Sequence, residues 1–136
     1  MIQLSSGHLA TRKLEDLVEN RTIYNLKNAE LNIFETHQQA ERVYLQLSDP
    51  TLASMITGKK IMHIDGLPSF DFFPGESVVM PSKKEMIIDF PIANQNSPTQ
   101  CLALGIDSTK INEVVDRFNY QVAIENENNN WSIATN

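Results

Sequence analysis

The sequence predicts a mainly β protein, a sandwich or barrel, with a helix near each end of the chain. Many short apolar segments follow one another at near-regular spacing from residue 23 to residue 106, without helices between them. Gly58 and Asp65-Gly66 stand between such segments as tight-turn signals. From Ser108 the apolar period changes from that of a strand to that of a helix.

The clearest strand is Arg42–Leu47, in which Val43, Leu45 and Leu47 alternate with more polar residues. Such alternation places these three side chains on one face. The remaining predicted strands have the following bounds: Ile23–Leu26, Leu31–Phe34, Leu52–Thr57, Lys60–Asp65, Ser69–Phe73, Ser77–Met80, Met86–Phe90 and Gln100–Ile106.

Two helices are predicted, and we expect both to cover the barrel. Over residues 8–21 an amphipathic face is formed by Ala10, Leu14, Leu17 and Val18, with Ser5 or Ser6 available as the cap. After Asp107 or Ser108, either of which could cap a helix, a second stripe is formed by Ile111, Val114, Val115, Phe118 and Val122.

These elements divide the chain into four parts. An N-terminal helical segment is expected over 1–22, a β-barrel over 23–107 and a C-terminal helix over 108–122. The Asn-rich stretch 123–136 is expected to be a polar tail or the start of a linker.

Composition excludes several classes of protein. The chain has 136 residues and a formal net charge of −6, and its 11 Lys and Arg are scattered, which opposes direct binding of nucleic acid. No apolar run approaches the length of a membrane span, and the N-terminus lacks the apolar stretch of a secretory signal. The single Cys101 excludes an internal disulfide, so a cytoplasmic location is expected.

No arrangement of catalytic residues stands out. Cys101 lies among apolar residues on a predicted strand, where a thiol usually packs inertly. His8 and His37 have no evident nucleophile partner, and the five glycines occur singly, so no phosphate-binding loop is expected. We expect no catalytic residue and no cofactor.

The segment 75–90 resembles the second conserved box of cupins. Gly75 and Pro81 occupy the turn-forming positions of that box, but Met86 stands at the position of the metal-binding His and Phe90 at that of the Asn. Counting back for the first box places Ile61 and His63 at its two His positions and Pro68 at its Glu position. The resemblance therefore implies the scaffold without most of the ligands, and we expect no metal.

Strand alternation from this cupin register predicts a ligand pocket. The side chains expected to face one cavity are Ile61, His63, Met86, Ile88 and Phe90. A mostly apolar cavity with one titratable group suits a small amphipathic ligand. The same side chains could equally fill the barrel.

Four stretches resemble the N-terminal domain of AraC-type transcription regulators: LNIFET (31–36), TGKKIM (57–62), FFPGESVVMP (72–81) and NSPTQCLALGID (96–107). The resemblance implies a cupin-like barrel, a double-stranded β-helix, that binds a small effector or dimerises, without turnover. It also implies that DNA is bound only through a C-terminal helix-turn-helix domain, which we do not find in this sequence.

The leading hypothesis is therefore a non-enzymatic regulatory domain with a small-molecule effector and a possible homodimer. A metal-dependent cupin enzyme and a protein-interaction domain with a filled barrel are the alternatives.

Overall fold

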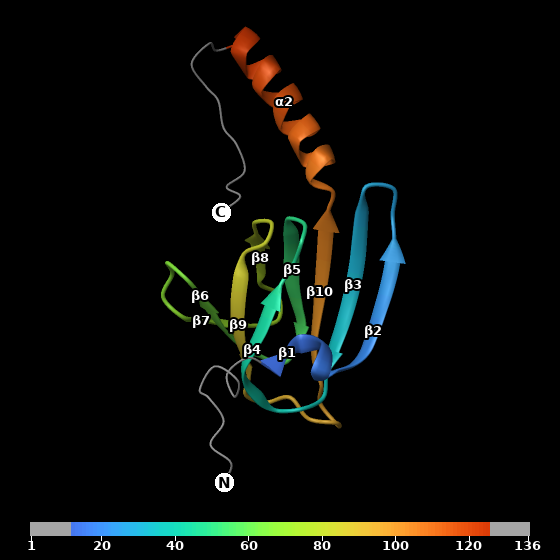
Figure 1. Cartoon of the computed structure of the whole chain (residues 1–136), viewed down its shortest axis with the longest axis vertical. Coiled ribbons are helices and arrows are strands. Elements are labelled where there is room, and N and C mark those ends of the chain that lie inside the picture. The colour runs from blue at the N-terminus through green and yellow to red at the C-terminus, as the bar shows by residue number, and fades with distance from the viewer. Residues whose placement is uncertain (1–11, 126–136) are drawn as a thin grey trace.

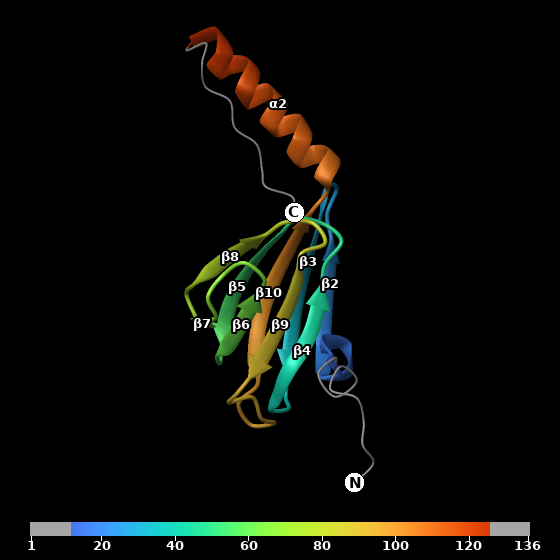
Figure 2. The ribbon, with the colours of Figure 1, turned by 60° about the vertical axis from the view of Figure 1, so that its left-hand side comes forward.

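The computed structural model describes residues 12–125 of the chain. Within this range, two five-stranded sheets face each other, in the strand orders β1-β4-β9-β6-β7 and β2-β3-β10-β5-β8 (Figures 1 and 2). The elements in chain order are β1 (Arg12–Lys13), the 3₁₀ turn η1 (Leu14–Asp16), β2 (Val18–Asn25), β3 (Ala29–Thr36), β4 (Ala40–Gln46), β5 (Thr51–Thr57), β6 (Lys60–Ile64), β7 (Phe70–Phe72), β8 (Ser77–Met80), β9 (Glu85–Phe90), β10 (Thr99–Ile106) and α2 (Ser108–Glu125). The predicted mainly β class is confirmed.

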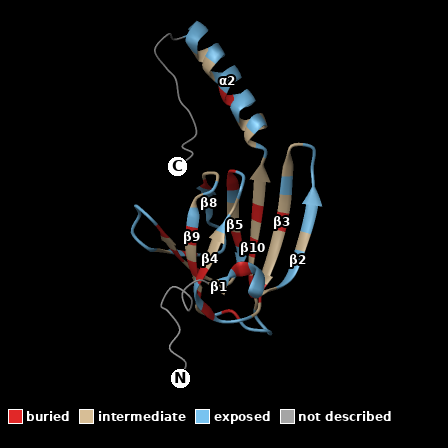
Figure 3. Cartoon of the chain, viewed as in Figure 1, coloured by how far each residue is buried: buried red, intermediate tan, exposed pale blue. Residues whose placement is uncertain are grey.

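The core lies between the two sheets, where buried side chains come from every strand except β1 and β2 (Figure 3). Phe72, Phe90 and Ile88 are almost fully buried there, as are Val43 and Leu17. Their removal from water is the main stabilising term, about 1.5–3 kcal/mol for each large apolar side chain. The opposite faces of both sheets are turned outward.

The predicted N-terminal helix is wrong over residues 12–21, and residues 8–11 lie outside the described part. The chain makes one 3₁₀ turn at Leu14–Asp16 and then enters β2, which pairs antiparallel with β3. Leu14 and Leu17 belong to the barrel core. The short turn is enough to bury both leucines, and strand pairing satisfies the backbone groups that a helix would otherwise satisfy.

The predicted C-terminal helix is confirmed and extends to Glu125. Asp107 caps it, since its Oδ1 accepts the backbone N–H of Thr109 at 2.9 Å. The expectation that this helix covers the barrel is wrong: α2 projects beyond the end of both sheets from the end of β10 (Figures 1 and 2).

Candidate functional site

The five predicted pocket residues do not share one cavity. Met86, Ile88 and Phe90 on β9 are buried in the barrel, with relative exposures of 4%, 1% and 0%. In the register between β6 and β9, Ile88 pairs with Met62, whereas Ile61 pairs with Asp89. Ile61 and His63 are only partly buried and lie on the outer face.

The prediction failed because it took the outward positions of β6 for the inward ones. Along Lys60–Ile64, apolar residues occupy both faces, so alternation alone does not decide which face points inward. The inward side chains of β6 are those of Lys60, Met62 and Ile64, with exposures of 6%, 2% and 6%.

The barrel interior is almost filled. Met86 and Ile88, together with Met62, Phe72 and Met80, line a cavity of about 20 Å³. That is room for about one water molecule. Lys60 also borders this cavity, and its ammonium lies 5.5 Å from the centre of the Phe90 ring, where it makes a favourable cation–π contact.

A larger hollow lies at the mouth of the barrel. A groove of about 470 Å³ has Lys13, Leu14, Glu15 and Val18 on one wall and residues 44–47, at the end of β4, on the other. Phe34, Leu45 and Leu47 border both this groove and the small interior cavity, so they form the layer that separates the two. The groove is thus far roomier than the cavity inside the barrel.

A second hollow of about 260 Å³ continues the groove toward Asp49 and Gly105. Both hollows are lined by Arg21, Phe34, Gln46 and Leu47. Arg21 therefore stands at the junction, where it can face a ligand lying in either part.

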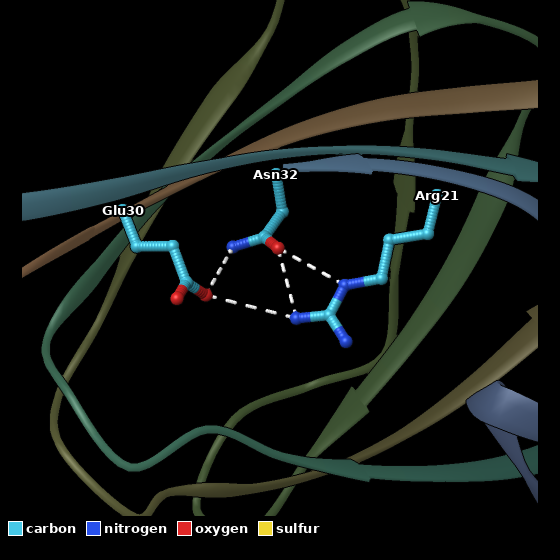
Figure 4. A network of polar contacts seen from close by, with 3 residues as sticks. All are labelled: Arg21, Glu30 and Asn32. Atoms are coloured by element: carbon cyan, nitrogen blue, oxygen red, sulfur yellow. Dashed lines mark hydrogen bonds and ion pairs between the residues drawn. The ribbon is translucent and has the colours of Figure 1, made fainter. Parts of the chain in front are cut away.

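Arg21 is held by a polar network that Figure 4 shows. Its Nε and Nη2 donate to Asn32 Oδ1 at 3.0 and 2.9 Å, and Nη2 lies 3.6 Å from Glu30 Oε1. Asn32 Nδ2 in turn donates to the same Glu30 oxygen at 3.0 Å. Asn32 is 8% exposed, whereas the Arg21 side chain is 47% exposed, so the buried amide fixes an accessible guanidinium.

The guanidinium also lies over the Phe34 ring, 5.3 Å from its centre. Phe34 thereby offers its apolar face to the groove beside a cation. Nη1 of Arg21 makes none of the contacts drawn in Figure 4 and points away from Glu30 and Asn32. A planar donor beside an apolar surface suits an acceptor group on a small amphipathic molecule.

The other wall of the groove is fixed by hydrogen bonds of β4. Tyr44 donates to Glu85 Oε1 at 3.2 Å, and Gln46 Nε2 donates to the carbonyl of Lys83 at 2.7 Å. Partial desolvation, the Glu85 charge and the hydrogen bond to it raise the pKa of Tyr44, which keeps the phenol protonated.

Arg21 and Asn32 were missed by the sequence analysis. Arg21 fell within the predicted N-terminal helix, so it was not considered as a pocket residue. The β-branched pair Thr22-Ile23, followed by Tyr24, was the available sign of a strand there.

His63, the polar member of the predicted pocket, belongs to a separate network on the outer face. Its Nδ1 lies 2.6 Å from Ser69 Oγ and its Nε2 2.8 Å from Asp89 Oδ2. Asp89 Oδ1 accepts the backbone N–H of Arg42, whose φ of 55° marks the irregularity in the pairing of β4 with β9. This series of hydrogen bonds ends on the backbone of Arg42 and holds the bulge of β4 in place. The role of His63 is therefore structural.

The described residues contain no group of three or more His, Cys, Asp or Glu side chains that could hold a metal ion. His63 and Asp89 are only two such groups, and Cys101 is buried alone in the core.

Comparison with known proteins identifies the relationship. A family model described as the AraC-type transcriptional regulator N-terminus matches residues 27–136. No curated protein sequence matches the chain.

Solved structures agree on the fold. A cupin superfamily protein from Desulfitobacterium hafniense has 12% identity and a TM-score of 0.51, covering 67% of this chain and 81% of its own. An RmlC-like cupin with a double-stranded β-helix fold from Methanocaldococcus jannaschii has 12% identity and a TM-score of 0.51, covering 68% and 84%. A Ralstonia eutropha protein provisionally assigned as a mannose-6-phosphate isomerase has 14% identity and a TM-score of 0.53, covering 66% and 87%. At these identities the likeness establishes the cupin fold and nothing about activity.

Among residues 12–125, no helix is long and apolar enough to cross a membrane.

Proposed function

Because the chain belongs to the AraC-type transcriptional regulator N-terminus family, we propose that it senses a small molecule for a transcription regulator and does so without catalysis. The observation on which this rests is the contrast between the two hollows. The interior cavity has about 20 Å³, whereas the groove at the mouth has about 470 Å³ and combines an apolar floor with an accessible guanidinium. A small effector fits the groove but not the interior cavity.

The effector is an amphipathic molecule with an acceptor group. Phe34, Leu45 and Leu47 present apolar surface, and Arg21 presents N–H donors already oriented by Asn32. Since Asn32 and Glu30 fix the guanidinium before binding, the ligand loses less affinity to side-chain ordering. Nε and Nη2 are already engaged by Asn32 and Glu30, so the acceptor that Nη1 can take is a single oxygen, such as a carbonyl, a hydroxyl or one oxygen of a carboxylate.

Of the buried predicted residues, Met86 and Ile88 then have an indirect part. They line the interior cavity beneath the floor of the groove, and methionine can change rotamer at small cost. A ligand whose apolar end presses on Phe34 or Leu45 is accommodated by Met86 and Met62. Ile61 and His63 have no part in this binding, since they lie on the outer face.

The wider setting follows from the family. We propose a cytoplasmic regulator in which this domain also dimerises and DNA is bound by a separate helix-turn-helix domain. The net charge of −6 is consistent with a domain that does not itself bind nucleic acid. No metal or cofactor is needed for this role.

The test is a thermal-shift screen of the full chain against small carboxylates, sugars and amines, with divalent metals in parallel. A ligand present at a hundred times its Kd stabilises the folded state by about 2.7 kcal/mol. This raises Tm by roughly 10 °C for a domain of this size. Arg21→Ala should abolish the shift caused by the best compound. Arg117→Ala is the matched control, because that arginine lies exposed on α2 and pairs only locally with Glu113.

A shift caused by a metal alone would overturn the proposal in favour of a metal-dependent cupin. If no compound shifts Tm, a filled barrel that acts through protein contacts becomes the better account.

A further inference from the structure

Gly105 lies near the end of β10, and the backbone does not require a glycine there. Its φ is outside the left-handed region, and it pairs in regular register with Glu30 on one side and Thr51 on the other. A Cβ at this position would meet only ordinary van der Waals neighbours, the nearest being the carbonyl oxygen of Glu30 at 3.8 Å. A glycine inside a strand that neither a bulge nor a turn explains marks a place that another group approaches closely.

The space beside Gly105 is the second hollow, of about 260 Å³. Its floor is the inner face of the sheet, because the next inward residue of β10, Ala103, pairs with Asn32. Thr51, Ala103 and Asn32 are 4%, 6% and 8% exposed, so the floor is built of buried side chains. At about 30 Å³ for each water in the liquid, the hollow has room for a group of several non-hydrogen atoms.

One negative charge at this hollow has no partner. Glu30 is paired with Arg21 across 3.6 Å, so these two charges largely offset each other. Asp49 also lines the hollow, and its carboxylate makes no ion pair or hydrogen bond with residues 12–125. The Cβ of Asp49 lies 3.9 Å from the point that a Cβ on Gly105 would occupy. The side chain of Asp49 therefore borders the space that the glycine leaves open.

Further acceptors surround the same space. Thr51 Oγ1 donates to the carbonyl of Asp49 at 2.9 Å, which leaves the lone pairs of the hydroxyl available. The second carboxylate oxygen of Glu30 makes none of the contacts drawn in Figure 4. An ammonium group has three donors and no acceptor. The hollow thus offers acceptors from three residues to a group that needs three.

The chain's own lysine on this side does not occupy the hollow. Lys27 lines a neighbouring hollow of about 300 Å³ together with Glu30 and Asp49. Within the described range its ammonium forms an ion pair with neither carboxylate. The place beside Asp49 is therefore open to a cation from outside the chain.

We propose that the second hollow is a subsite for the cationic end of the effector, a primary amine carried on an apolar body that lies in the groove. Phe34 and Leu47 line both hollows, so one molecule can occupy them together. Arg21 lies at the junction, where its Nη1 can donate to an oxygen between the apolar body and the amine. This inference names the class of effector and rests on the function proposed above.

Amide NMR of the full chain tests the subsite with three matched probes. Phenylethanolamine, phenylethylene glycol and mandelate share a phenyl ring and a hydroxyl, and they end in an ammonium, a hydroxyl and a carboxylate. Phenylethanolamine should shift the backbone amides of Gly105 and Thr51 and the side-chain amide of Asn32. The glycol should bind at least about 10-fold more weakly, and mandelate more weakly still, because only the amine can pair with Asp49.

A charge variant tests the carboxylate. Asp49→Asn keeps the shape of the side chain and removes its charge, so it should weaken binding of phenylethanolamine about 10-fold and leave that of the glycol unchanged. Asp116→Asn, at an exposed position of α2, is the control with the same change in net charge. It should change neither affinity.

Substitutions of Gly105 test the space. Gly105→Ala adds a Cβ without a close neighbour, so this variant should melt no lower than the parent chain. Gly105→Leu fills the hollow and should abolish the shifts that phenylethanolamine causes at Thr51 and Asn32. Its melting temperature without probe shows whether the fold is kept, and if it is not, Asp49→Asn decides. Unchanged binding by a folded Gly105→Leu chain would reject the subsite.

Other results would also overturn the proposal. Equal binding of the three probes, or a preference for mandelate, contradicts a cationic subsite. The same amide shifts with sodium or calcium chloride alone would indicate an inorganic cation. Absence of shifts at about 20 mM phenylethanolamine, enough to saturate a site with a Kd of about 1 mM, would show that the hollow does not bind amines.

The two proposals fail separately. If a compound from the thermal-shift screen loses its effect in Arg21→Ala but keeps it in Asp49→Asn and Gly105→Leu, effector sensing stands and the amine subsite is rejected. If no compound shifts Tm while phenylethanolamine still shifts the amide of Gly105 and Asp49→Asn weakens it, the amine site stands and the sensing role fails.

Discussion

His63 Nε2 lies 2.8 Å from Asp89 Oδ2, and the other oxygen of the same carboxylate accepts the backbone N–H of Arg42 at 2.8 Å. One side chain of β9 thus connects a histidine of β6 to the bulge of β4. Since β9 lies between β6 and β4, this connection joins three adjacent strands of the sheet. The histidine that the sequence placed in the pocket instead supports the scaffold behind it.

Replacing the histidine should weaken the fold modestly. His63→Ala removes the hydrogen bond to the carboxylate of Asp89, whose side chain is only 19% exposed. We expect a loss of about 1 kcal/mol in the free energy of unfolding, at the low end because the histidine itself is partly solvated. Urea denaturation measures it, with His37→Ala as the control. A loss no greater than that of the control would contradict the role assigned to His63.

Asp89 should make stability depend on acid pH. Burial raises its pKa, but the hydrogen bonds from His63 and from the Arg42 backbone, and the nearby positive charge, outweigh it, so the pKa is lowered from 3.8. The carboxylate therefore stabilises the fold above pH 3.8, and this stabilisation is lost as pH falls through the lowered folded-state pKa.

In Asp89→Asn this contribution should be absent. The slope of unfolding free energy against pH below 3.8 should be shallower than in the parent chain. Asp71→Asn is the control, because Asp71 lies at the sheet edge in an exposed pair with Lys59. Parallel acid profiles for Asp89→Asn and the parent would count against the assignment.

Gly58 and Gly66 form a matched pair for a test of close packing. Both have φ of 87°, but a Cβ at Gly58 would lie 2.5 Å from Thr99 Oγ1 and 2.9 Å from Thr99 Cα, whereas nothing lies within 4 Å of one at Gly66. Gly66→Ala should cost about 1–2 kcal/mol for the left-handed backbone alone. Gly58→Ala should cost at least about 2 kcal/mol more, because backbone must shift. Equal melting temperatures for the two variants would show that the turn at Gly58 yields freely.

Thr99 offers a stabilising substitution. Its Oγ1 is buried and has no hydrogen-bond partner among the described residues. Thr99→Val removes this hydroxyl at nearly constant shape, so we expect a gain of about 1 kcal/mol in unfolding free energy. Thr57→Val should instead lose about 1 kcal/mol, since Thr57 Oγ1 bonds to the carbonyl of Pro98 at 3.0 Å and to Gln100 at 3.1 Å. A loss in Thr99→Val would indicate that the hydroxyl has a water or ligand partner in solution.

The strands and the C-terminal helix were predictable because their signals are local. Val43 and Leu45 alternate with more polar residues within β4, and Asp107 lies directly before the helix that it caps. The N-terminal helix failed because Leu14, Leu17 and Val18 fit a helical period, while strand pairing of β2 with β3 is a contact that no local pattern records.

The amino-acid sequence by itself determined the mainly β class and the family resemblance, since each depends on residue types at fixed spacings. The tertiary structure alone decided which face of β6 points inward and that Arg21, Asn32 and Phe34 meet at the mouth of the groove. It also decided that Glu30, Gly105 and Thr51 lie side by side on three neighbouring strands. The physical reason is that strand register is fixed by pairing and burial between distant segments, and a shift of one residue exchanges every inward side chain for an outward one.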